Sequence, residues 1–111
     1  MSKTQMRKAL TARKRRAEST QRQRVHDQVW ARDAACRACG GTRETHGLPD
    51  QMHHDPKLSQ TRGMKPEERS NTRVCVRVCH TCHLDLEALR MQLAFADDVV
   101  RFDGGVAFVL R

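Results

Sequence analysis

The sequence predicts a small α+β domain whose hydrophobic core needs a second source of stability. Valine alternates with other residues over 73–78, which is the period-two pattern of a half-buried strand. Apolar residues then recur at spacings of four, three and four over 82–93, which predicts a helix that reaches about Phe95. Only 38% of the 111 residues are hydrophobic and 4% are aromatic, so burial alone supplies a modest core.

The N-terminal segment 1–18 carries most of the positive charge. The chain has a formal net charge of +8, and this segment holds seven basic residues and one acidic residue, a net of +6. Blocks of like charge repel, so we expect a mobile tail or a frayed helix. Such a tail either grips a phosphate backbone without regard to sequence or only keeps the protein soluble. The residues of this segment expected to contact nucleic acid are Arg13, Lys14, Arg15 and Arg16.

Between this tail and the first cysteine, the sequence predicts a helix. A capping box over 20–23 begins it, and the helix runs to about Asp33. Val25, Val29 and Trp30 fall on one side of the helix. We expect that side to pack against the rest of the domain.

Two further elements complete the predicted domain, which spans 19–111 and holds its motifs within about 25–95. A short strand over about 51–54 is expected inside an otherwise polar stretch that contains proline and glycine. Near the C-terminus, two apolar runs flank an Asp-Gly-Gly turn, which predicts a β-hairpin over about 99–110. One face of this hairpin is expected to cap the core.

Four of the five cysteines form two Cys-x-x-Cys pairs with the spacing of zinc knuckles, Cys36 with Cys39 and Cys79 with Cys82. Four thiolates around one Zn²⁺ make a closed structural site that contributes folding free energy, which the small core lacks. Disulfides are disfavoured because no secretion signal is visible and the cysteine count is odd. A redox motif is disfavoured because no βαβ pattern surrounds either pair. Cys75 is expected to be a small buried residue, although Cys75 and Cys79 form a competing ligand pair.

The segment between the two cysteine pairs and the residue after them supply a second cluster, in the order His-His, Asn and Cys-x-x-Cys-His. In this order the sequence resembles the HNH endonuclease family over about residues 25–90. The residues that carry the resemblance are Cys36-Arg37-Ala38-Cys39-Gly40, Met52-His53-His54, Ser59-Gln60-Thr61-Arg62-Gly63, Asn71 and Cys79-His80-Thr81-Cys82-His83. The resemblance implies a ββα-metal (His-Me finger) core, in which the first strand ends at the histidine pair and the helix begins at the second cysteine pair.

The resemblance also implies roles for the residues of this pattern. His54 is the general base, a task that suits the near-neutral pKa of histidine. His53 and His83 hold a catalytic divalent ion, separate from the structural zinc. The two neighbouring histidines exchange roles in one alternative, because some relatives carry His-Glu at this place. Asn71 braces the loop or orients the base.

The sequence leaves the identity of the catalytic ion open among Mg²⁺, Mn²⁺ and Ni²⁺. Glu87, one helical turn after His83, either orients the ring of His83 or forms an ordinary surface pair. Relatives commonly have a carboxylate ligand, and the only acidic residues beside the histidine pair are Asp50 and Asp55. Arg62 and Arg69 are expected either to hold the scissile phosphate or to be plain surface charges.

The function implied by the resemblance is metal-dependent hydrolysis of DNA, as nicking with low sequence specificity. The rival hypotheses are a catalytically silent, zinc-stabilised DNA-binding module and a DNA-targeting domain of a larger toxin or repair system. Small stand-alone proteins of this family often belong to phages, so the expected partners are DNA and phage terminase or other packaging proteins. The expected location is the cytoplasm of a bacterial host. A membrane span is excluded because the longest clean apolar stretch, Gly104–Leu110, is far too short to cross a bilayer, and no membrane partner is expected.

Overall fold

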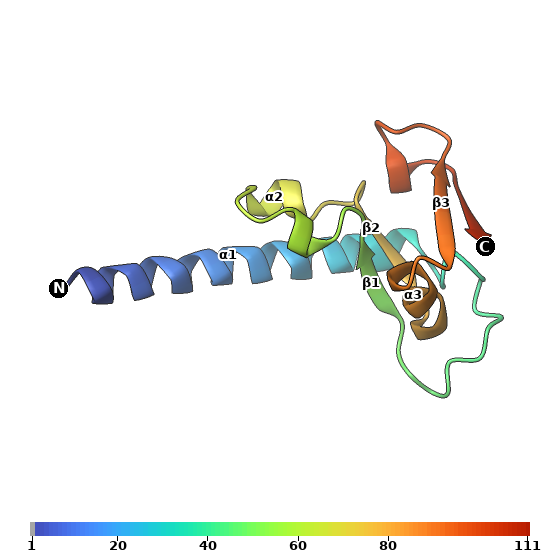
Figure 1. Ribbon diagram of the computed structural model, residues 1–111, viewed down its shortest axis with the longest axis horizontal. Coiled ribbons are helices and arrows are strands. Elements are labelled where there is room, and N and C mark those ends of the chain that lie inside the picture. Colours follow the sequence, from blue (N-terminus) through green and yellow to red (C-terminus); the bar gives the residue numbers. More distant parts are fainter. Residues whose placement is uncertain (1) are drawn as a thin grey trace.

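The computed structural model describes residues 2–111 and has the α+β architecture that the sequence predicts (Figure 1). A long N-terminal helix is followed by two small antiparallel hairpins, and one short helix precedes and another follows the second strand along the chain. In chain order the elements are α1 (Lys3–Arg32), β1 (Gln51–His54), the 3-10 turn η1 (Leu58–Gln60), α2 (Pro66–Arg69), β2 (Cys75–Val78), α3 (His80–Glu87), β3 (Met91–Phe95), the 3-10 turn η2 (Arg101–Asp103) and β4 (Val106–Leu110).

Helix α1 begins much earlier than the capping box over 20–23 predicts. Ser2 and Gln5 form a capping box of their own, in which the Gln5 amide donates to Ser2 Oγ at 3.2 Å and the Ser2 amide donates to Gln5 Oε1 at 2.9 Å. Alanine, arginine, lysine and glutamine, which are good helix formers, dominate the segment that follows. Segment 1–18 is therefore helical from Lys3 onwards. The predicted end is confirmed, since Asp33 is the C-cap.

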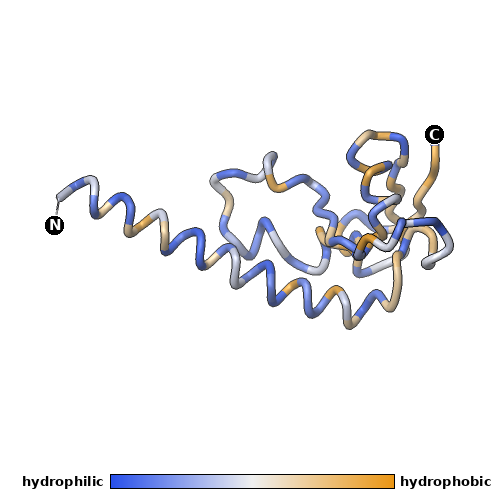
Figure 2. The backbone as a smooth tube through the Cα atoms, turned by 90° about the horizontal axis from the view of Figure 1, so that it is seen from below, coloured by the Kyte–Doolittle hydropathy of each residue, from blue (hydrophilic) through white to orange (hydrophobic). Residues whose placement is uncertain are grey.

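Only the C-terminal half of α1 packs on the domain. Val25 and Val29 are buried against Cys75, and Trp30 is half-buried beside them, as the sequence predicts. The N-terminal half projects away from the body of the protein and is coloured mostly hydrophilic (Figures 1 and 2). No helix within residues 2–111 combines the length and apolar character needed to cross a membrane.

Strands β1 and β2 form the hairpin that carries the histidine pair. They are antiparallel, with His53 opposite Val76 and His54 opposite Cys75. Both predicted strands are confirmed, at 51–54 and within 73–78. Strand β2 is buried on both faces. Helix α1 covers one face, and the hydrophobic cluster that contains the paired cysteines covers the other. Cys75 is fully buried, as expected.

Helix α3 is shorter than predicted, and the expectation that it reaches Phe95 is wrong. Its C-cap is Ala88, and Leu89 follows in the left-handed region with φ 58°. The Leu89 amide donates to the Leu86 carbonyl at 3.2 Å, and the Arg90 amide donates to the Asp85 carbonyl at 2.8 Å. This pair of bonds is a Schellman motif, which terminates a helix. The chain then forms β3, so the apolar residues after position 89 follow a strand period.

The C-terminal hairpin exists, but the strand pairing differs from the predicted 99–110 hairpin. Strand β4 pairs with β3, from Met91 opposite Leu110 to Phe95 opposite Val106. The segment expected to be the first strand forms a turn and η2 instead, because Phe102 is fully buried in the core there. Val106 and Phe108 pack against that core, as predicted, whereas Leu110 is exposed.

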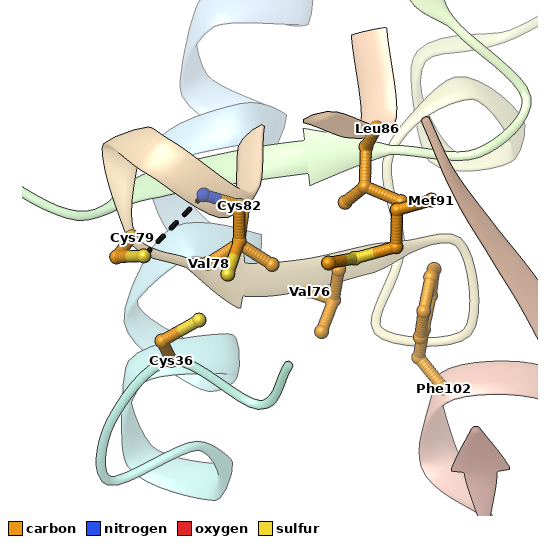
Figure 3. Packing of buried hydrophobic residues seen from close by; sticks show 8 residues of the cluster. All are labelled: Cys36, Val76, Val78, Cys79, Cys82, Leu86, Met91 and Phe102. Atoms are coloured by element: carbon orange, nitrogen blue, oxygen red, sulfur yellow. Dashed lines mark hydrogen bonds between the residues drawn. The ribbon is translucent and has the colours of Figure 1, made fainter. Parts of the chain in front are cut away.

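One hydrophobic cluster joins the cysteine pairs to both hairpins. Figure 3 shows the sulfur atoms of the labelled cysteines at one end of this cluster and the larger apolar side chains at the other end. Its buried members are Cys36, Val76, Val78, Cys79, Cys82, Leu86, Met91 and Phe102. The cysteine site is thus continuous with the core.

Candidate metal centres

The four knuckle cysteines converge from two distant segments. Cys36 and Cys39 lie in the turn after α1, and Cys79 and Cys82 lie at the start of α3. All four Sγ atoms lie within 4.8 Å of one another. Gly40, with φ 66°, lets the chain turn tightly behind the first pair, and its amide donates to the Cys36 carbonyl at 2.7 Å.

The sulfur geometry fits a tetrahedral zinc ion. Zn–S bonds of about 2.3 Å place the sulfurs of a tetrahedral site about 3.8 Å apart, and Cys39 Sγ lies 3.8 Å from Cys79 Sγ. Burial raises the pKa values of Cys79 and Cys82, and the neighbouring cysteine Cys36 raises them further. Although burial opposes it, the backbone amides of Arg43 and Gly41 lower the pKa of Cys39 to about 6. The four-cysteine group is therefore consistent with a structural zinc site, as predicted.

Arg43 supports this centre from outside the cysteine set. Its guanidinium donates to Cys82 Sγ at 3.6 Å and to Asp85 Oδ2 at 2.5 Å. The other carboxylate oxygen of Asp85 accepts from Arg90 at 2.8 Å. Arg43 thus offsets thiolate charge and ties the long loop to α3. No pattern in the sequence identifies it, because it acts across 39 residues of chain.

A second group of possible ligands forms where β1 faces α3. His53 Nδ1 lies 3.5 Å from Glu87 Oε1, and the same oxygen lies 3.4 Å from His83 Nε2. The rings of His53 and His83 meet edge to face, with centroids 5.4 Å apart. The three ligand atoms lie within 4.8 Å of one another, which makes a two-histidine, one-carboxylate group able to hold a divalent ion.

The ring of His53 fits a metal ligand for a further reason. Its Nδ1 atom is buried and, within residues 2–111, makes no hydrogen bond, although Glu87 Oε1 lies 3.5 Å away. Burial, followed by the nearby His83, lowers the pKa of His53, which favours the neutral ring that binds metals. A buried polar atom without a partner is costly, so a bound cation would satisfy it.

Glu87 is the third member of this group. The sequence offered it as an orienting residue or an ordinary surface pair, and its carboxylate in fact lies close enough to His53 and His83 to be a ligand itself. Although partial burial opposes it, the Lys57 ammonium lowers the pKa of Glu87. The i,i+4 spacing of His83 and Glu87 on α3 is the pattern that places both on one helix face. The two acidic neighbours of the histidine pair are used elsewhere: Asp50 pairs with Arg77, and Asp55 pairs with Arg101.

His54 lies beside this group, on the opposite side of the strand from His53. Its Nε2 atom shares a hydrogen bond of 3.0 Å with Ser70 Oγ. Burial, helped by the neighbouring His53 and Arg22, lowers the pKa of His54 to about 4, so its ring is neutral at pH 7. His54, His83 and Glu87 line one groove of about 300 Å³.

Ser70 is a site residue that the sequence does not reveal. It is buried at the end of α2, and its carbonyl accepts from Gln21 Nε2 of α1 at 3.0 Å. These contacts fix the hydroxyl against the ring of His54. A lone serine in a polar loop carries no recognisable pattern, so only the folded chain brings it to the site.

Asn71 braces the loop, which is one of the two roles expected for it. Its Nδ2 atom donates to the Glu67 carbonyl at 3.1 Å, and its Oδ1 atom accepts from the Arg73 amide at 3.0 Å. These bonds close the turn between α2 and β2. Asn71 lies four residues before β2 and next to Ser70, the hydrogen-bond partner of His54.

The arginines expected to contact nucleic acid fall into different settings. Arg69 forms an ion pair with Glu18 at 2.7 Å and donates to the Leu58 carbonyl at 3.0 Å, so its charge is used to tie the loop to α1. Arg62 is exposed. Three arginines and one lysine are exposed along the projecting half of α1: Arg13, Lys14, Arg15 and Arg16.

No protein-family model, curated protein or solved structure matches this chain. Its function must therefore be inferred from the chemistry of its own residues.

Proposed function

We propose that this protein is an endonuclease of the HNH type that hydrolyses phosphodiester bonds in DNA with the help of a bound divalent ion. One observation carries the proposal. The ligand atoms of His53, His83 and Glu87 converge beside His54, and the buried Nδ1 atom of His53 makes no hydrogen bond within residues 2–111. A strand hairpin and a helix supply these side chains in the order that the resemblance implies.

The residues of the chain divide the chemical work. His54 accepts the proton of the attacking water, and Ser70 keeps its ring oriented through their hydrogen bond. His53, His83 and Glu87 would hold the divalent ion. When bound, that ion supplies positive charge to the phosphoryl oxygen and to the departing 3′ oxygen. Two imidazoles and one carboxylate favour Mn²⁺ or Ni²⁺ over Mg²⁺, which prefers oxygen ligands.

The projecting half of α1 supports nucleic acid as the substrate. It presents exposed Arg13, Lys14, Arg15 and Arg16 on a continuous helix. Lysine and arginine contacts to phosphates fix position without reading bases, which explains the low sequence specificity we propose. Phage packaging proteins such as terminase are the protein partners that the resemblance suggests.

Plasmid nicking tests the proposal. Zinc-loaded protein is incubated with supercoiled plasmid and Mg²⁺, Mn²⁺ or Ni²⁺, with and without EDTA. We expect nicking that EDTA abolishes and that His54→Ala lowers by about 100-fold or more. His46→Asn is the matched control, because His46 is exposed, lies outside the site and has φ 53°, which asparagine tolerates.

The outcomes separate the two hypotheses. Nicking by His54→Ala at the wild-type rate would show that this histidine is not the base. DNA binding without nicking under any of the three ions would favour the silent, zinc-stabilised DNA-binding module.

A further inference from the structure

Lys57 lies against the candidate metal group, although no pattern in the sequence assigns it a role. It follows the loop after β1 and immediately precedes η1. Its Nζ atom lies 3.0 Å from Glu87 Oε2, while the other oxygen of that carboxylate faces the two histidines. One carboxylate thus divides its two oxygens between the ammonium and the candidate metal ligands.

Two grooves meet at this lysine. The groove of about 300 Å³ that contains His54 and His83 is lined by Lys57. A second groove, of about 530 Å³, contains His53 and Arg111 and is also lined by Lys57. The histidines of the metal group are therefore divided between the grooves, and Lys57 borders both. A polynucleotide strand that ran from one groove into the other would pass a phosphate beside this ammonium.

We propose that Lys57 is a phosphate-binding residue of this site, held by Glu87 in the free protein and released when that carboxylate becomes a metal ligand. The inference rests on the proposed function and identifies Lys57 as the residue that binds the scissile phosphate. A lysine ammonium is a compact charge on a flexible stem with three donors, so it can exchange one oxygen partner for another. The exchange conserves charge pairing, because Lys57 leaves a carboxylate and gains a phosphate oxygen.

This exchange couples metal binding to phosphate binding. Lys57 competes with a dication for Glu87, so it weakens metal binding in the absence of substrate. Both side chains are about 40% exposed, at 39% for Lys57 and 40% for Glu87, so water screens their attraction and the competition is modest. Once the metal group is filled, Lys57 is free for phosphate, so each ligand strengthens binding of the other.

The experiment measures metal affinity and cleavage separately. Zinc-loaded protein is titrated with Mn²⁺, and free Mn²⁺ is followed by electron paramagnetic resonance. Mn²⁺ stands lowest in the affinity order of divalent metals, so it leaves the thiolate zinc site alone. We expect Lys57→Met to bind Mn²⁺ about two- to fivefold more tightly than wild type, and to nick plasmid at saturating Mn²⁺ with a kcat lowered about 100-fold.

Two further variants make the result specific. Lys57→Arg keeps the positive charge and should restore most of the kcat and the wild-type Mn²⁺ affinity. Lys65→Met removes an exposed lysine from the same loop and should change neither quantity. Because Lys57 is on the surface, its substitution is expected to leave the fold and the zinc content intact, which circular dichroism and elemental analysis check.

Each contrary outcome has its own meaning. If Lys57→Met binds Mn²⁺ as wild type does or more weakly, Lys57 does not compete for Glu87 and the proposal is wrong. If Lys57→Met nicks at the wild-type kcat, the phosphate role is wrong while the nuclease function stands. If wild-type protein binds no Mn²⁺ and nicks no DNA, the proposed function itself fails.

Discussion

Cys82 and His83 are neighbours in the first turn of α3, yet their side chains belong to two different candidate metal centres. The four-cysteine group anchors the start of the helix that carries His83 and Glu87. Order at the second centre therefore depends on the first.

The first prediction follows from this link. Elemental analysis should give about one zinc per chain, and Cys82→Ser should lose it. The same variant should bind Mn²⁺ about 10- to 100-fold more weakly, although no ligand of the second centre has changed. Cys75→Ala is the control, because Cys75 is buried away from the zinc group. Wild-type Mn²⁺ affinity in Cys82→Ser would mean that the two centres are independent.

Leu89→Gly should stabilise the protein. Leu89 is 64% exposed and has φ 58°, a conformation that costs a side chain about 1 kcal/mol and that glycine adopts freely. We expect a gain of about 0.5–1 kcal/mol, seen as a rise in Tm of about 2–8 °C. Leu84→Gly, an exposed leucine inside α3, should lower the Tm instead. A lower Tm for Leu89→Gly would contradict the Schellman ending of α3.

Ser70→Ala should slow cleavage without affecting metal binding. The change removes the hydroxyl that shares a hydrogen bond with His54, so the ring loses its orientation. We expect nicking to fall about tenfold while Mn²⁺ affinity stays the same. Ser19→Ala, an exposed serine of α1, serves as the control. Equal nicking rates in the two variants would show that Ser70 has no role in cleavage.

The projecting half of α1 should supply much of the salt dependence of DNA binding. Each phosphate contact adds about 0.9 to the slope of log affinity against log salt concentration. Replacing its four clustered basic residues with glutamine, which keeps the helix, should therefore flatten this slope by up to about 3.6. The substituted residues are Arg13, Lys14, Arg15 and Arg16. Fluorescence anisotropy at several salt concentrations measures this slope. An unchanged slope would show that this half of α1 does not contact DNA.

Cys75 should resist alkylation while α1 is docked. Burial raises the pKa of its thiol from the ordinary 9.0 to about 12, and only the thiolate reacts. At pH 8 iodoacetamide should therefore leave Cys75 unlabelled in zinc-loaded protein and label it fully in denaturant. Peptide mass spectrometry reports both states. Rapid labelling of the native protein would show that α1 leaves β2 readily.

Local patterns in the sequence predicted the parts of the fold that depend on local spacing. The two cysteine pairs and the strands over 51–54 and 75–78 lie where they were expected. The predicted helix after Cys82 is longer than the observed one. Leu86, Leu89 and Leu93 fit a helical period even though Leu93 belongs to a strand. The spacing of apolar residues does not reveal the left-handed turn at Leu89 that separates helix α3 from strand β3.

The error in the predicted C-terminal hairpin has a different cause. An Asp-Gly-Gly turn indicates a hairpin between its neighbours, but burial of Phe102 outweighs that local preference. In the candidate site, the histidine pair and His83 could be named from the sequence. Ser70, Arg43 and Lys57 could not, because each acts on a partner far along the chain.

The length of α1 sets a reach on one side of the proposed cleavage site. About 15 residues project beyond the ion pair of Glu18 with Arg69, which is about 22 Å of helix. Laid along a duplex, that length covers about six or seven base pairs. A nuclease footprint on bound DNA should therefore be lopsided, with the longer protected flank on the side to which α1 points.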